Sequence, residues 1–117
     1  MIERKRGKFI GRNKSSAYKD LLWTVATAKD STLQLKEQIK QTLQTIEENL
    51  NELNSNKKSI VSAQVYLANI TDKQVMDDLW KKWIGDNSDY WPQRASLGVD
   101  LEGSILVEIT VTAIRQF

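Results

Sequence analysis

The chain has 117 residues, 40% of them hydrophobic and 27% charged, a size and composition typical of one globular domain spanning residues 1–117. It contains neither cysteine nor histidine. This excludes disulfides and Ser-His-Asp or Cys-His catalysis, and it leaves only oxygen ligands for a metal, so no metal site is expected. No apolar run approaches the roughly 20 residues that cross a bilayer, and no signal-peptide pattern follows the basic N-terminus. We therefore expect a cytoplasmic protein with no membrane partner.

The formal net charge of +2 is unevenly distributed along the chain. Residues 1–14 form a basic N-terminal strand or arm, in which Glu3 is the one acidic residue. The six basic residues are Arg4, Lys5, Arg6, Lys8, Arg12 and Lys14. Such an arm could contact an anionic partner, but without interleaved aromatic residues it is more typical of a solvated edge strand. Nucleic-acid binding is therefore not expected.

The first half of the sequence predicts two strands and a long helix. The strands are expected over residues 2–12 and 21–28, with a turn-rich break at residues 13–16. Ser31 and Gln34 have the spacing of a capping box and should open the helix. Its apolar residues recur every three or four positions and form one buried stripe, consisting of Leu35, Ile39, Leu43, Ile46, Leu50 and Leu53. The helix should end at residues 54–56, because asparagine tolerates the left-handed conformation.

The second half predicts one more helix and three more strands. Alternating residues indicate strands over 59–68, 93–99 and 105–115. The helix should begin at Thr71 and end near Gly85, and we interpret its Met and Trp stripe as core. The order is ββαβαββ, which predicts an α+β two-layer sandwich in which two helices cover one face of a mixed sheet. The other face is semi-polar and must meet either water or another subunit, so a site could lie between chains.

Arg94 and Glu108 stand out as candidate site residues, because strand alternation places each on an otherwise uncharged surface. A guanidinium binds a planar carboxylate through two parallel hydrogen bonds, and Ser96 and Gly98 would leave room for a small ligand beside it. A carboxylate on a neighbouring strand could then hold or deprotonate a water molecule. The alternative, which spacing alone favours, is that the two residues form a cross-strand ion pair.

Several motifs in their order and spacing resemble the Rid family, also called the YjgF family. They are residues 62–70 (SAQVYLANI), the helix ending Trp80-Lys81-Lys82-Trp83, residues 91–99 (WPQRASLGV) and residues 107–113 (VEITVTA). The run from Gln38 to Leu53 is also similar to the first helix of that family. The resemblance covers roughly residues 18–115, and it is most specific in Pro-x-Arg and Val-Glu-Ile.

The resemblance implies a chorismate mutase-like fold and a homotrimer with ligand clefts between subunits. It also implies cofactor-independent hydrolysis of reactive 2-imino or enamine acids to 2-keto acids and ammonia. By motif position, Arg94 would bind the substrate carboxylate and Glu108 would position the attacking water. Ser96 matches a position close to the ligand, and Asp77 stands near the substrate where many members have asparagine.

Two alternatives to a deaminase remain open. One is a non-catalytic trimer that binds a small carboxylate metabolite in the same cleft. Three departures from the family pattern favour it: Asp77 in place of asparagine, no glycine in residues 24–28 and no tyrosine in residues 12–16. The other is a ribonuclease or inhibitor of translation, for which the basic arm is the one supporting feature. The small-molecule partner expected in the first two cases is a carboxylate or imino acid.

Overall fold

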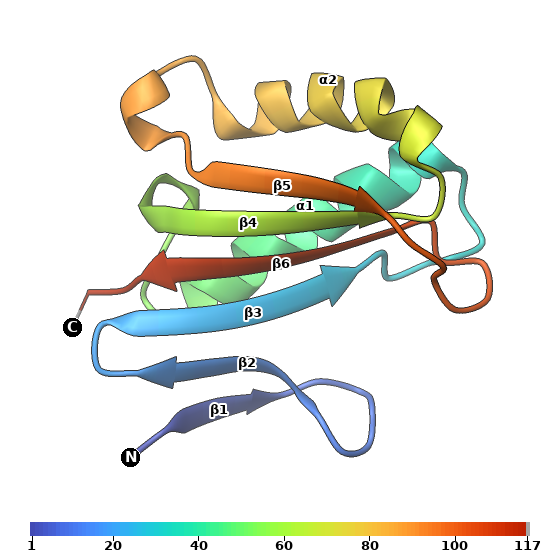
Figure 1. Cartoon of the computed structure of the whole chain (residues 1–117). Coiled ribbons are helices and arrows are strands. Elements are labelled where there is room, and N and C mark those ends of the chain that lie inside the picture. Colours follow the sequence, from blue (N-terminus) through green and yellow to red (C-terminus); the bar gives the residue numbers. More distant parts are fainter. Residues whose placement is uncertain (117) are drawn as a thin grey trace.

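The computed structural model describes residues 1–116 and contains a six-stranded sheet with two α-helices (Figure 1). The strands are β1 (Glu3–Arg6), β2 (Asn13–Tyr18), β3 (Leu21–Thr27), β4 (Ile60–Leu67), β5 (Gln93–Gly98) and β6 (Val107–Ile114). The helices are α1 (Leu35–Glu52) and α2 (Lys73–Ile84), with short 3-10 turns at Lys57–Ser59, Ile70–Asp72 and Ser88–Tyr90. The expected mixed α+β class is confirmed.

The strand order in the sheet is β1-β2-β3-β6-β4-β5. The β4–β5 pair is parallel, because α2 crosses between these two strands, and the other pairs are antiparallel. One consequence matters for the site: β4 lies between β5 and β6, so the strands of Arg94 and Glu108 are not neighbours.

The N-terminal prediction was wrong in detail. The strand expected over residues 2–12 is limited to Glu3–Arg6, and the segment expected as a turn belongs to β2. Its serines and asparagine suggested a turn, but Ser15 is buried and donates a hydrogen bond to the Thr24 hydroxyl at 2.8 Å. Because β3 satisfies this polar side chain, a polar segment forms a strand and the sheet has six strands instead of five.

One apolar core joins the helices to a single face of the sheet. It contains Ile39, Ile46 and Leu50 of α1, Met76 and Trp80 of α2, and the inward residues of β4 and β6. The stripe predicted for α1 and the core role of the α2 stripe are therefore confirmed. Gln38 is fully buried beneath them, and it donates to the Ser104 carbonyl and accepts from the Leu106 backbone amide, each at 3.0 Å. These bonds fix the segment that leads into β6.

The helix ends follow local chemistry only in part. Asn54 has the left-handed φ of 63° at the end of α1, and Gly85 has a φ of 92° at the end of α2, as the sequence predicted. The capping boxes were wrong. Helix α1 begins at Leu35 without a side-chain cap, and Asn69 caps the 3-10 turn that precedes α2 by accepting from Thr71.

The second face of the sheet carries no helix and is partly exposed. Trp23 of β3 is 43% exposed there, and Gln64 and Thr110 lie on it joined by a 2.8 Å hydrogen bond. No helix within residues 1–116 is long and apolar enough to span a membrane.

Candidate functional site

Arg94 lies on the helix-covered face of β5, at the edge of the sheet. Its register partner on β4 is Ala63, a core residue, and paired residues share a face. The guanidinium forms an ion pair with Asp77 of α2 and lies over the ring of Trp80, 5.1 Å from its centroid. The acid and the ring thus fix the arginine in one orientation.

Two polar atoms beside this ion pair have no hydrogen-bond partner. They are Nη1 of Arg94 and Oγ of Ser96, and both are buried. Arg94 and Ser96 are two positions apart on one strand, so their side chains share a face. An unpaired buried polar group costs about 1–3 kcal/mol and requires an explanation, such as a ligand that supplies the missing partner.

The space expected beside Gly98 is not available for a ligand. A Cβ atom at this position would lie 2.8 Å from the Cβ of Ile70, so the Ile70 side chain already fills it. Gly98 is required by close packing of the turn Ile70–Asp72 against β5. That part of the sequence interpretation was wrong.

Asp77 is the acidic neighbour of Arg94 on α2. Lys73, one turn earlier on the helix, also forms an ion pair with it at 2.8 Å. Partial burial raises the pKa of Asp77, but hydrogen bonds from Lys73 and Arg94 and their positive charges together hold this pKa below its ordinary value of 3.8. Asp77 is therefore ionised at neutral pH, and it accepts a hydrogen bond from one of the two terminal nitrogens of the Arg94 guanidinium.

Glu108 lies on the other face of the sheet. Its neighbours in β6, Val107 and Ile109, are fully buried against the helices, so Glu108 points the opposite way. It pairs with Tyr66 of β4 and Thr27 of β3. The structure therefore does not bring Glu108 and Arg94 together in one protomer, and the expected cross-strand ion pair does not form.

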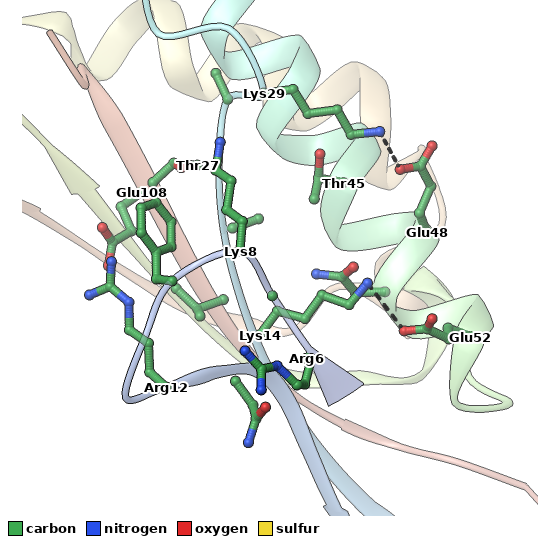
Figure 2. Close-up of a pocket in the computed structure, with 17 residues that line it drawn as sticks. Arg6, Lys8, Arg12, Lys14, Thr27, Lys29, Thr45, Glu48, Glu52 and Glu108 are labelled. Carbon is green, nitrogen blue, oxygen red and sulfur yellow. Dashed lines mark hydrogen bonds and ion pairs between the residues drawn. The ribbon is translucent and has the colours of Figure 1, made fainter. Parts of the chain in front are cut away.

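Glu108 borders a pocket of about 670 Å³ along the free edge of β3 (Figure 2). Strand β2 pairs with β3 only over residues 21–24, which leaves the end of β3 open on that side. The connection between β1 and β2 closes around this opening, and α1 forms the far wall. The volume lies within the range of roughly 300–1,000 Å³ that is usual for small-molecule sites.

Five cationic and three acidic side chains line this pocket. Lys14 pairs with Glu52 at 3.4 Å and Lys29 with Glu48 at 3.0 Å, both on the α1 side (Figure 2). Among the described residues, the other three cations form no ion pair with an acidic side chain. These are Arg6, Lys8 and Arg12. The basic arm is therefore not a plain solvated strand, since it supplies one wall of a pocket.

The sequence did not single out Trp80 as a neighbour of Arg94, nor the arm as a pocket wall. Trp80 carried only the helical spacing of a core residue, and it is indeed a core residue. For the arm, the concentration of positive charge was the available signal. Residues 1–116 contain no group of three or more acidic side chains arranged to hold a metal ion.

Comparison with known proteins identifies the family. Residues 24–115 match the family model described as Endoribonuclease L-PSP. A RutC family protein of Haemophilus ducreyi is 34% identical over 85 residues, which cover 72% of this chain and 71% of the relative. The chain belongs to the Rid/YjgF family.

Solved structures of this Rid/YjgF fold superpose over nearly the whole chain. An uncharacterised protein from Pseudomonas aeruginosa matches with a TM-score of 0.88 and 23% identity, covering 99% of this chain and all of that one. A member of the YjgF protein family from Neisseria meningitidis matches with a TM-score of 0.87 and 22% identity, covering 100% of this chain and 97% of that one. At these identities the likeness concerns the fold.

Proposed function

We propose that this protein hydrolyses reactive 2-imino and enamine acids to 2-keto acids and ammonia, without a cofactor, in sites between the subunits of a homotrimer. Family membership supports a role of this kind. The observation that carries the proposal is the buried, unpartnered Nη1 of Arg94, together with the unpartnered hydroxyl of Ser96. A ligand carboxylate would supply the hydrogen-bond acceptor that both groups lack.

Arg94 and Ser96 would bind the substrate carboxylate. Asp77 occupies Nη2 of the guanidinium, which leaves Nη1 as the free donor. Asp77 would therefore border the bound acid and orient Arg94 rather than contact the reacting carbon. A small movement of the Asp77 side chain, which is 32% exposed, would open the guanidinium to the ligand.

Glu108 would position and activate the attacking water. The water oxygen adds to the imine carbon, one of its protons passes through Glu108 to nitrogen, and the resulting carbinolamine loses ammonia to leave the keto acid. An enamine first tautomerises to the imine by protonation at carbon. Since an imine is already electrophilic, orientation and one activated water suffice in a chain that lacks histidine and cysteine.

Arg94 and Glu108 can act on one ligand only if they come from different subunits. Arg94 faces the helices and Glu108 faces the open side, with β4 between their strands. The partly exposed open face around Trp23 provides the surface on which a second copy would pack. A shared site requires an arrangement in which Arg94 of one subunit lies opposite the Glu108 pocket of another, and this arrangement is part of the proposal.

A second candidate is a trimer that binds a small carboxylate without hydrolysing it. The ion pair between Asp77 and Arg94 favours this alternative, because an acid already neutralises the arginine and would lower its affinity for a substrate carboxylate. Both candidates use the same cleft, and they differ in turnover.

A trapping assay separates them. A dehydratase generates 2-iminobutanoate in the presence of semicarbazide, and the release of 2-oxobutanoate is followed with this protein, with Arg94→Ala and with Lys82→Ala, an exposed change on α2. The deaminase predicts faster release with the wild type and with Lys82→Ala, and no acceleration with Arg94→Ala. Binding of 2-oxobutanoate without acceleration by the wild type would support the second candidate.

A further inference from the structure

The pocket beside Glu108 contains more positive charge than a monocarboxylic acid needs. Lys14 and Lys29 are neutralised by glutamates of α1. The remaining charged groups of the lining are three cations, Arg6, Lys8 and Arg12, and one carboxylate, Glu108. Under the proposed function, Arg94 of another subunit already binds the carboxylate next to the imine. The three cations of the arm then have no partner in that reaction.

The β1–β2 connection holds two of these cations in place. Arg12 lies over the ring of Phe9, 4.4 Å from its centroid, and Lys8 lies 5.5 Å from the same centroid. Cation–π interactions with the Phe9 ring thus hold both positive charges at the wall of the pocket. In the view of Figure 2, Arg12 lies on the same side as Glu108, and both ion pairs to α1 lie on the opposite side.

We propose that the ligand of this pocket carries a second negative group, a carboxylate on its side chain, which Arg6, Lys8 and Arg12 bind. The preferred substrate is then an imino acid with an acidic side chain, and its product is a dicarboxylic keto acid. This specificity rests on the proposed function for the chemistry at the imine carbon. The pocket volume of about 670 Å³ accommodates a five-carbon dicarboxylate.

Binding of two product-like keto acids tests the charge preference directly. The dicarboxylate 2-oxoglutarate is compared by calorimetry with 2-oxopentanoate, which has the same five-carbon chain without the second carboxylate. We expect the wild-type protein to bind 2-oxoglutarate at least about tenfold more tightly, a difference of about 1.4 kcal/mol. Since the cations are exposed, the preference should weaken as salt is raised.

Two double variants locate the source of the preference. Lys8→Gln/Arg12→Gln should reduce it to about threefold or less, because two of the three cations are removed. Lys36→Gln/Lys40→Gln removes the same charge from the exposed side of α1 and should leave the preference intact. All four side chains are exposed, so both variants should fold as the wild type does.

Equal affinities of the wild type for the two keto acids, or no binding of either, would overturn the proposal. So would a preference that survives in Lys8→Gln/Arg12→Gln. These outcomes are distinguishable from failure of the proposed function, which concerns turnover: a protein that prefers 2-oxoglutarate but releases no keto acid from an imine would keep the second-anion site and lose the deaminase.

Discussion

Arg94 and Glu108 point to opposite faces of one sheet, and β4 separates their strands. Arg94 faces α2, where Asp77 and Trp80 hold its guanidinium. Glu108 faces the open side and borders a pocket that the basic arm closes. This relationship means that a site using both residues must be shared between two chains.

Glu108→Gln should abolish turnover and preserve binding. The amide keeps the size and one hydrogen-bonding oxygen of the carboxylate, but it no longer accepts a proton from water. Turnover of 2-iminobutanoate should fall by about a hundredfold or more, while the affinity for 2-oxobutanoate should stay within about threefold, since one charge on the pocket wall changes. Glu102→Gln, in the exposed turn before β6, is the matched control and should leave turnover unchanged.

Ser96→Ala should separate a ligand-binding hydroxyl from a structural one. Because Oγ of Ser96 is buried without a partner, its removal should leave the free energy of unfolding unchanged or raise it by about 1 kcal/mol. The affinity for 2-oxobutanoate should nevertheless fall several-fold, measured by calorimetry on the same sample. A clear loss of stability with unchanged affinity would show that the hydroxyl serves the fold alone.

The Asp77–Arg94 ion pair should make stability depend on pH. The pKa of Asp77 is lowered in the folded state, so its contribution is present above the ordinary value of 3.8 and is lost as pH falls through the lower folded value. Asp77→Asn should therefore be less stable than the wild type by about 1 kcal/mol at neutral pH, a value discounted for partial exposure. Denaturant unfolding at several pH values should show this difference shrinking below pH 3.8.

Asp78→Asn is the matched control for that experiment. It removes an exposed carboxylate from the same helix without touching Arg94. A difference between Asp77→Asn and the wild type that stays constant from neutral pH to pH 3 would contradict the role assigned to the ion pair.

Periodicity in the sequence was sufficient for most of the fold. The three- and four-residue spacing from Leu35 to Leu53 predicted α1 correctly, and residue alternation predicted β4 and β6. It failed at β2, where a polar segment is a strand because Ser15 bonds to Thr24 across the sheet. A partner that lies nine residues away leaves no local pattern.

The candidate site was only partly accessible to the same reasoning. Alternation placed Arg94 and Glu108 on otherwise uncharged surfaces of their strands. It could not give the order of strands in the sheet, in which β4 lies between β5 and β6. The contact of Asp77 with Arg94 depends on how α2 lies over β5, and the wall formed by Lys8 and Arg12 depends on the path of a connection. These are tertiary relationships, and single-strand patterns do not encode them.

The shared site is tested most directly by mixing two inactive variants. Under the proposed function, Arg94→Ala loses the group that binds the carboxylate and Glu108→Gln loses the group that positions water, so each variant alone should be inactive in the trapping assay. Refolded together in equal amounts, about a quarter of the sites should combine an intact Arg94 with an intact Glu108 from the neighbouring subunit. We predict recovery of about that fraction of wild-type turnover. A mixture that remains as inactive as its two parents, beside an active wild type, would contradict a site shared between subunits.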